Sequence, residues 1–277
     1  MPELPEIETI RQRLEKSVGG AQIVRAKADD PLIITPADMR RLSRVAKGQT
    51  LESLDRCGKV LILGLSGGWS VLQRFGMTGQ MYPLPASEPL PPHTRMVWDL
   101  ADGRRLVYRD ARRFGATHVV KTANLAAELS GVCRLGQDAL TADVSPAEFA
   151  AMLGDHATPI KTWLLDQTHL AGIGNIYAAE ILFRARISPL RPAKSLDAKE
   201  SRLLLRLIGE VLEEAVAAQG TTISDYIPEA GATGGFQKFL RAYGRAGEPC
   251  RRRGCGGTIV RIVQTQRSTF YCPECQK

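Results

Sequence analysis

The spacing of apolar residues differs between the two halves of the chain. Residues 7–18 carry apolar side chains every three or four positions, which predicts an amphipathic helix that ends at Gly19-Gly20. From there to about residue 120, short apolar runs are broken by glycine and proline, which is typical of strands and turns. The runs that we expect to be strands are 60–65, 69–75, 96–100, 105–108 and 117–120, and the proline-rich stretch 83–92 predicts an exposed loop.

The second half has a helical pattern. A short helix is expected within 122–145, and Ser145, Pro146 and Glu148 then supply an N-cap, a proline at the first helical position and a capping-box acid. Further helices are expected from Pro159 to Asp166, over 176–184, and over 197–219 with Gly220 as C-cap. These patterns predict an α+β protein with a β-rich N-terminal half and a helical C-terminal half.

Length and charge narrow the class of protein. A chain of 277 residues is long enough for two domains, and a formal net charge of +8 favours a polyanionic partner, nucleic acid before membrane. No apolar run approaches the ~18 residues of a membrane span, and the N-terminus is acidic, unlike a basic signal peptide. We expect a soluble cytoplasmic protein with no membrane partner.

Four of the six cysteines fall within the last 28 residues. Cys250 and Cys255 have four residues between them, Cys272 and Cys275 have two, and sixteen residues separate the pairs. Two cysteine pairs joined by a β-hairpin suit tetrahedral thiolate coordination of one structural zinc ion. The same stretch is rich in arginine, so we expect the finger to face nucleic acid. The alternatives are a zinc clip that only caps the fold and a chance cluster.

The N-terminal octet suggests covalent chemistry. Removal of Met1 would leave Pro2 with a secondary amine that can attack a sugar aldehyde carbon and form an iminium. An α-amino group titrates near pH ~7.7–8, so much of it is nucleophilic at neutral pH. Glu3 lies beside it as a general acid or base. The alternative is an ordinary chain start in which Glu6 and Glu8 favour the N-terminus of a helix.

Two further stretches suggest contacts with nucleic acid. The turn Ala171-Gly172-Ile173-Gly174-Asn175 is typical of a helix–turn–helix variant whose backbone amides and Asn175 bind a phosphate, although packing would also explain its glycines. Arg112 and Phe114 alternate by two, so on an extended segment they point the same way and form a wedge for a base stack. Met77, near two glycines, is a second candidate wedge. For both wedges the alternative is burial in the core.

Together these features resemble one family along the whole chain, formamidopyrimidine-DNA glycosylase, the bacterial Fpg or MutM enzyme. The stretches that carry the resemblance are Pro2-Glu3-Leu4-Pro5-Glu6, Gly58-Lys59, Arg112-Arg113-Phe114-Gly115, Asp166-Gln167, Gly172-Ile173-Gly174-Asn175-Ile176-Tyr177, Tyr243-Gly244-Arg245 and the finger end 267–276. The resemblance implies an N-terminal β-sandwich domain with flanking helices, residues 1–133. It also implies a helix–two-turn–helix domain, residues 134–277, with a β-hairpin zinc finger at about 243–277.

The resemblance implies an activity as well, that of a bifunctional enzyme of base excision repair. Such an enzyme would excise oxidised purines (8-oxoguanine and formamidopyrimidines) from double-stranded DNA through an iminium at the N-terminal proline. It would then nick the strand by β,δ-elimination, and it would also act on abasic sites. DNA would lie in a basic cleft between the domains, zinc would be the cofactor, and the protein would be a monomer.

Residue roles come with the same resemblance. Pro2 would be the nucleophile at the deoxyribose C1′, Glu3 would shuttle protons, and Glu6 would support the site. Lys59 would contact phosphate and assist strand cleavage, and Arg267 would assist the second elimination. The residues expected to contact DNA are Lys59, Arg74, Met77, His93, Arg112, Phe114, His156, Lys161, Asn175 and Arg267, of which Met77, Arg112 and Phe114 would fill the gap left by the flipped nucleotide.

Several positions depart from the family pattern. The first cysteine pair is spaced by four residues, where two are commoner. Arg74 stands where histidine is frequent and His156 where lysine or arginine is frequent, while Ala111 replaces a frequent proline and Phe270 a frequent histidine. The glycine- and threonine-rich stretch 219–237 resembles the family's lesion-capping loop, and we expect it to select 8-oxoguanine.

Two other functions stay open. One is the sister activity on oxidised pyrimidines, as in endonuclease VIII, although Leu4 in place of a glycine and the finger sequence argue against it. The other is a non-catalytic zinc-finger DNA-binding protein with the same fold, which would not need Pro2, Glu3 and Lys59. A reducible covalent adduct with abasic DNA would discriminate an enzyme from a binder.

Overall fold

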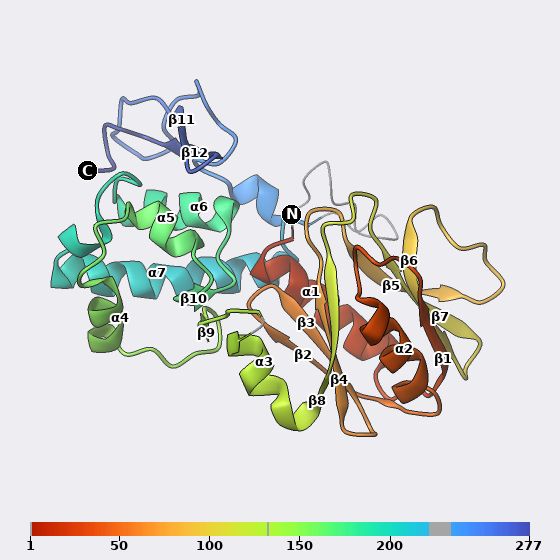
Figure 1. Cartoon of the computed structure of the whole chain (residues 1–277). Coiled ribbons are helices and arrows are strands. Elements are labelled where there is room, and N and C mark those ends of the chain that lie inside the picture. Colours follow the sequence, from red (N-terminus) through yellow and green to blue (C-terminus); the bar gives the residue numbers. More distant parts are fainter. Residues whose placement is uncertain (1, 132, 222–233) are drawn as a thin grey trace. The chain divides into compact units, whose positions relative to one another are not determined.

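The computed structural model describes residues 2–131, 133–221 and 234–277 (Figure 1). It divides into two compact units, which are described separately. The first unit comprises Met1–Arg134 and Gln219–Gly234, and the second comprises Leu135–Ala218 and Gly235–Lys277. Most of the expected capping loop, residues 222–233, lies outside the described residues.

The first unit contains two four-stranded antiparallel sheets. One sheet has the order β2 (Leu51–Cys57), β3 (Val60–Leu65), β4 (Trp69–Arg74), β8 (Ala116–Lys121). The other has the order β1 (Ile23–Ala28), β6 (Thr94–Leu100), β7 (Arg104–Arg109), β5 (Gln80–Pro85). Buried side chains of both sheets, such as Leu63 and Trp98, belong to one continuous apolar core, so the sheets form a sandwich.

Among the described residues of this unit, four helical segments flank the sandwich: α1 (Leu4–Val18), α2 (Pro36–Val45), η1 (Thr122–Asn124) and α3 (Leu125–Gly131). Helix α1 buries Ile7, Leu14 and Val18 in the shared core, and full burial of such a side chain contributes about 1.5–3 kcal/mol. It packs against β2, β3 and β5 and is therefore tied to both sheets. The chain start is thus attached to a helix that is anchored in the core.

The second unit is built on four α-helices, α4 (Pro146–Leu153), α5 (Ile160–Leu165), α6 (Asn175–Ala185) and α7 (Ala198–Ala217). Short parallel strands β9 (Gln137–Asp138) and β10 (Leu170–Ala171) and the 3-10 segments η2 (Ala193–Ser195) and η4 (Phe236–Phe239) complete it, together with the hairpin of β11 (Val260–Gln264) and β12 (Arg267–Tyr271). Gln167 holds the double turn between α5 and α6, because its amide donates to Ile173 O (3.0 Å) and accepts from Gly172 N (2.9 Å).

The predicted fold class is confirmed, with local corrections. The N-terminal helix begins at Leu4 instead of Ile7, and α7 ends at Ala217 with Ala218 as its C-cap, not Gly220. The proline-rich stretch is a loop only in part, because Pro83 and Pro85 belong to β5. Strand β5 lies at the edge of its sheet, where a residue without an N–H group is tolerated.

Within the described part of the chain, no helix combines the length and the apolar character that crossing a membrane requires.

Candidate active site and metal centre

The N-terminal end of α1 buries its acidic residues. Pro2 is buried, and Glu3 and Glu6 are only 2% and 4% exposed. Glu3 precedes the first helical residue, and its backbone N–H donates to Glu6 Oε2 at 2.9 Å. This contact closes the first turn and fixes the backbone on which Pro2 stands.

The second carboxylate oxygen of Glu6 holds the segment that follows α7. Glu6 Oε1 accepts from Thr221 N at 2.7 Å and from Thr221 Oγ1 at 3.0 Å. Gly220 has φ +76°, and a Cβ at this position would lie 2.6 Å from Glu6 Oε1, so glycine permits this close approach. Glu6 thus joins two distant parts of the chain next to Pro2, which fits the expected supporting role.

Lys59 lies in a two-residue turn between β2 and β3, where Cys57 pairs with Val60. The turn is tied to α1 by Arg56, whose Nη1 donates to Gly58 O at 3.0 Å and whose Nε lies 3.1 Å from Glu8 Oε2. Burial alone would raise the pKa of the Glu8 carboxyl group, but hydrogen bonds from Arg11, Gln12 and Arg56 outweigh it and hold that pKa below its usual value. Glu8 is therefore an ionised anchor for the Lys59 turn.

Sheet register gathers the expected DNA contacts of the first unit at one end of a sheet. Arg74, at the end of β4, pairs with Val60 on one side and with Ala116 on the other. The Lys59 turn, Arg74 with the following Met77, and the Phe114 segment therefore start from neighbouring strands. Gly76 allows the two segments to pack closely, because a Cβ on it would overlap the Phe114 carbonyl group.

Buried Asp110 shapes the Arg112–Phe114 segment. Its carboxylate accepts from Gly115 N (2.8 Å), Thr78 Oγ1 (2.5 Å) and Arg112 N (3.2 Å). Burial, together with the Asp110 charge, raises the pKa of Tyr108, so the phenol stays a donor to Asp110. One carboxylate thus fixes both candidate wedge segments.

Phe114 is 56% exposed, which excludes the core alternative for this ring. The guanidinium of Arg112 lies over the ring, 4.7 Å from its centroid. The expectation of a fully extended segment is wrong here, because Arg113 has φ +56°. Arg112 and Phe114 therefore meet through a cation–π contact and not through strand alternation. Met77 is half-buried in the neighbouring turn.

His93 lies beside the same segment. It precedes β6 and is exposed, with φ +67°, and its carbonyl oxygen accepts from Asp110 N at 3.0 Å. The structure thus places Arg74 at a strand end of the first unit, and the loops beside the strand ends carry the other expected contacts, Lys59, Met77, His93, Arg112 and Phe114.

In the second unit, Arg267 is presented by a tight hairpin. Thr265 and Gln266 form the two-residue turn between β11 and β12, both with positive φ (44° and 63°), as hairpins with a right-handed twist require. Arg267 follows directly and its side chain is exposed. His156 is also exposed, on the connection between α4 and α5.

Lys161 is interior, against the expectation of a direct DNA contact. It is 1% exposed, and its Nζ donates to Ser268 O at 3.0 Å and to Thr269 Oγ1 at 2.7 Å. Asn175 Nδ2 donates to the same Ser268 carbonyl at 3.0 Å. Both side chains therefore fasten the start of β12, next to Arg267, to helices α5 and α6.

Glu180 has a similar fastening role that the sequence argument missed. It is fully buried in α6, and its carboxylate accepts from the backbone N–H groups of Arg241, Ala242 and Tyr243 at 2.8–2.9 Å. Burial raises the pKa of Glu180 despite these hydrogen bonds. The motif Tyr243-Gly244-Arg245 was noticed in the sequence, but its spacing gives no sign of a partner 63 residues earlier.

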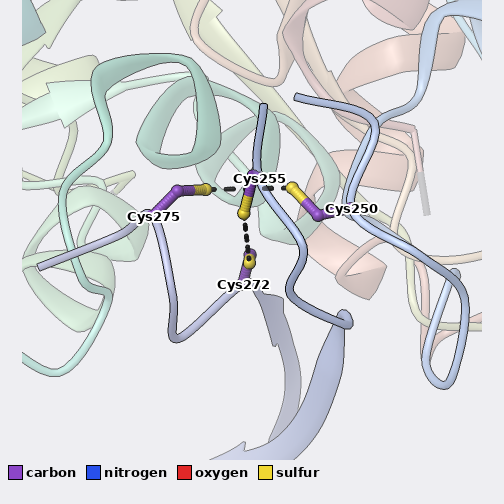
Figure 2. A group of neighbouring side chains, drawn as sticks. All are labelled: Cys250, Cys255, Cys272 and Cys275. Carbon is purple, nitrogen blue, oxygen red and sulfur yellow. Dashed lines mark hydrogen bonds between the residues drawn. The ribbon is translucent and has the colours of Figure 1, made fainter. Parts of the chain in front are cut away.

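The four cysteines of the finger form a metal site. Their Sγ atoms all lie within 4.8 Å of one another and point toward a common centre (Figure 2). Cys250 and Cys275 Sγ are 3.8 Å apart, and Cys255 and Cys272 Sγ are 3.7 Å apart. Zn–S bonds of about 2.3 Å in a tetrahedron place sulfurs about 3.8 Å apart. The thiolate set therefore fits one structural zinc ion, and the longer first spacing costs no ligand.

Three family models match successive parts of the chain. They are the formamidopyrimidine-DNA glycosylase N-terminal domain at residues 1–117, the H2TH domain of the same enzymes at 135–226, and the zinc finger found in FPG and IleRS at 247–277. Curated formamidopyrimidine-DNA glycosylases of Cereibacter sphaeroides (strain ATCC 17025 / ATH 2.4.3) and Heliobacterium modesticaldum are each 42% identical to this chain, with complete coverage of both sequences.

Solved structures agree with these matches. The MutM (Fpg) protein of Thermus thermophilus is 41% identical with a TM-score of 0.87, and the match covers 99% of this chain and 98% of that one. Lactococcus lactis Fpg in complex with DNA that contains an abasic site is 31% identical with a TM-score of 0.91 and complete coverage of both chains. A point mutant of that protein, bound to DNA that contains Fapy-dG, is 30% identical to this chain with a TM-score of 0.92, and the match again covers both whole chains.

The fold, the zinc finger and the full-length likeness define a DNA glycosylase, an enzyme of base excision repair. Among such enzymes, the chain belongs to the formamidopyrimidine-DNA glycosylase family, known as Fpg or MutM.

Proposed function

We propose that this protein excises oxidised purines from double-stranded DNA and then cleaves the strand at the resulting abasic site. The observation that carries the proposal is the N-terminus, where Pro2 and Glu3 are held on a buried, capped helix start. The relatives of known structure support the substrate class, since Lactococcus lactis Fpg was solved with abasic-site DNA and its mutant with Fapy-dG DNA.

The proposed reaction uses the free amine of Pro2 after Met1 is removed. The Pro2 nitrogen bonds to C1′ while the C1′–base bond breaks, and the N–H proton that this nitrogen gives up leaves with the base. Glu3 supplies the proton that opens the sugar ring, which leaves an iminium between Pro2 and C1′. Loss of a C2′ proton expels the 3′ phosphate, a second elimination expels the 5′ phosphate, and water finally releases Pro2.

The other residues act on the DNA. Lys59 and Arg74 neutralise phosphates, while Met77, Arg112 and Phe114 occupy the space left by the extruded nucleotide. Exposure of Phe114 and its contact with Arg112 support the wedge role. His93 and His156 contact the backbone, and Arg267 holds a phosphate next to the lesion. Lys161 and Asn175 position Arg267 through Ser268.

Cleavage of duplexes that each carry one defined lesion tests the substrate class. We expect release of 8-oxoguanine and formamidopyrimidines with strand cleavage that leaves phosphates at both ends. Preferred release of oxidised pyrimidines would favour the endonuclease VIII type of activity. Tight binding of every duplex without base release would favour a non-catalytic DNA-binding protein.

Glu6 should be sensitive to a change that keeps its size. In Glu6→Gln only one acceptor oxygen is left for the backbone N–H groups of Glu3 and Thr221, so one buried donor loses its partner at a cost of about 1–3 kcal/mol. We expect base excision to slow by roughly tenfold or more. Thr221→Val, which removes only the hydroxyl contact, is the matched control, and its rate of base excision should fall far less. Equal activity of Glu6→Gln and wild type would show that Glu6 does not organise the site.

Salt dependence should separate a phosphate contact from a positioning residue. Arg267→Ala should weaken DNA binding and reduce the slope of log K against log salt by roughly one unit, because one counterion-releasing contact is lost. Lys161→Met should weaken binding as well but leave the slope almost unchanged, since the buried ammonium group contacts protein oxygens. A reduced slope in Lys161→Met, or an unchanged slope in Arg267→Ala, would reverse these two assignments.

A further inference from the structure

A pocket of about 330 Å³ in the second unit lies beside Arg267. His156, Trp163, Asp166 and His169 line it together with Arg267, and threonine hydroxyls add polar groups. None of the roles given above uses His169, Trp163 or Asp166. The pocket therefore joins an exposed arginine, expected to hold phosphate, to His156, expected to contact the DNA backbone, and to His169, which has no assigned task.

The two imidazoles are held in a fixed arrangement. His169 stacks flat on the buried Trp163 indole, with ring centroids 4.6 Å apart and an interplanar angle of 7°. His156 meets His169 edge-on, with centroids 4.9 Å apart. Rings this close repel each other when both are protonated, so the pair favours the doubly protonated state only when an anion is nearby.

The fixed charges in the pocket lining cancel. Arg267 is positive and Asp166 is negative, and Asp166 Oδ2 lies 3.8 Å from His169 Nε2. The other oxygen, Asp166 Oδ1, is occupied by Thr168 N (2.9 Å) and Thr168 Oγ1 (2.8 Å). The net charge of the lining is therefore set by the histidines, which makes the pocket neutral at high pH and cationic at low pH.

Neighbouring groups do not change this balance. Asp155 precedes His156 in the chain, and Lys194 contacts it through a backbone hydrogen bond from Lys194 N to His156 O at 3.0 Å. These two side chains are exposed and opposite in charge. Burial lowers the pKa of His169, with the His156 charge in the same direction and the Asp166 charge against it. Without a ligand, then, His169 is mainly neutral near pH ~7.

We propose that this pocket is a proton-dependent oxyanion site, in which His156 and His169 bind a DNA backbone phosphate next to the one held by Arg267. The proposal rests on the DNA-binding function proposed above. The hydroxyls of Thr158 and Thr162 in the same lining supply further donors. Because the anion stabilises a protonated imidazole, its binding favours proton uptake by the pair, so the contact is present at low pH and is lost as the pH rises.

The site is tested first without DNA, on the full zinc-loaded chain with ¹⁵N-labelled histidine. The chain has four histidines, of which His118 lies outside the pocket and serves as internal control. Inorganic sulfate is the probe, since it stays dianionic across the titration. At constant ionic strength, replacing chloride by sulfate should raise the titration midpoints of His156 and His169 by about half a unit or more and leave His118 unchanged. Equal shifts of all histidines, or none, would overturn the proposal.

DNA affinity gives the second test. The affinity for an uncleavable abasic-site duplex is measured at about pH 8 and at about pH 5.5. The gain in affinity at the lower pH should be about tenfold larger for wild type than for His156→Gln or His169→Gln. His169→Gln should still form the Pro2 adduct, so this test and the test of the catalytic proposal fail separately. A pH dependence in both variants as steep as in wild type would show that the pair does not bind phosphate.

Discussion

Replacing Pro2 by glycine is expected to remove most of the glycosylase activity, by at least about 10²-fold, comparable to the loss of a positioned catalytic group. Glycine still ends in an amine, so a residual activity should persist, but that amine is primary and its imine with C1′ activates the sugar only while it stays protonated, whereas the iminium of Pro2 is always cationic. The rate of base release under single-turnover conditions should fall, while DNA affinity should stay close to that of wild type, because Pro2 contributes chemistry and not phosphate contacts.

The control for this variant is the same substitution at another helix start. Pro36 opens α2 in the same unit, so Pro36→Gly reports the general cost of replacing a proline by glycine near a helix start. Pro36→Gly should release bases at the wild-type rate. If Pro2→Gly releases 8-oxoguanine as fast as Pro36→Gly, Pro2 is not the nucleophile.

Loss of one zinc ligand should have the second large effect. Wild type should contain one zinc per chain, and Cys272→Ala should lose it, because the metal contributes roughly 10–16 kcal/mol to the folding of such a small module. Arg267 stands on β12, which ends next to Cys272, so the hairpin that presents it would lose its order. We expect DNA affinity to fall by roughly 2–4 kcal/mol, while the first unit keeps its thermal transition.

Cys133→Ala is the matched control for the zinc site. Cys133 is also buried, but it lies in the first unit and outside the sulfur cluster. Its replacement should change neither the metal content nor DNA affinity. Normal DNA binding by metal-free Cys272→Ala would show that the zinc serves only to cap the fold.

Local chemistry explains which parts of the site were predictable from sequence. The spacing of the cysteines predicted the zinc site, because four thiolate ligands must meet at one metal ion. The structure places all four sulfur atoms together. The finger was expected to face nucleic acid because it is rich in arginine, and the side chain of Arg267 on its hairpin is exposed. The contact between Glu3 and Glu6 is equally local, with residues only three apart, but the pattern of apolar residues began the helix at Ile7 and did not predict this cap.

Long-range pairing explains what the sequence could not predict. Lys161 looks like a surface cation in the sequence, and only the fold shows that Ser268 and Thr269, more than a hundred residues later, accept its hydrogen bonds. Asp110 and Glu180 are buried carboxylates that accept hydrogen bonds from backbone N–H groups, and such partners carry no sequence signal. Strand β5 was missed for a related reason, since its prolines are tolerated only because the strand is at a sheet edge.

The histidine pair shows the same limit. His156 was noticed as a departure from the family pattern, but His169, later in the chain, was not. Their rings meet because both pack around Trp163, and this contact depends on the turn after α5.

The most direct test of the account is reductive trapping with abasic-site DNA. Borohydride should convert the iminium into a stable tertiary amine, and a peptide map of the adduct should place the DNA on Pro2 with Met1 absent. An adduct on Lys59, or an equal yield of adduct from a chain that retains Met1, would contradict the assignment of Pro2 as the nucleophile.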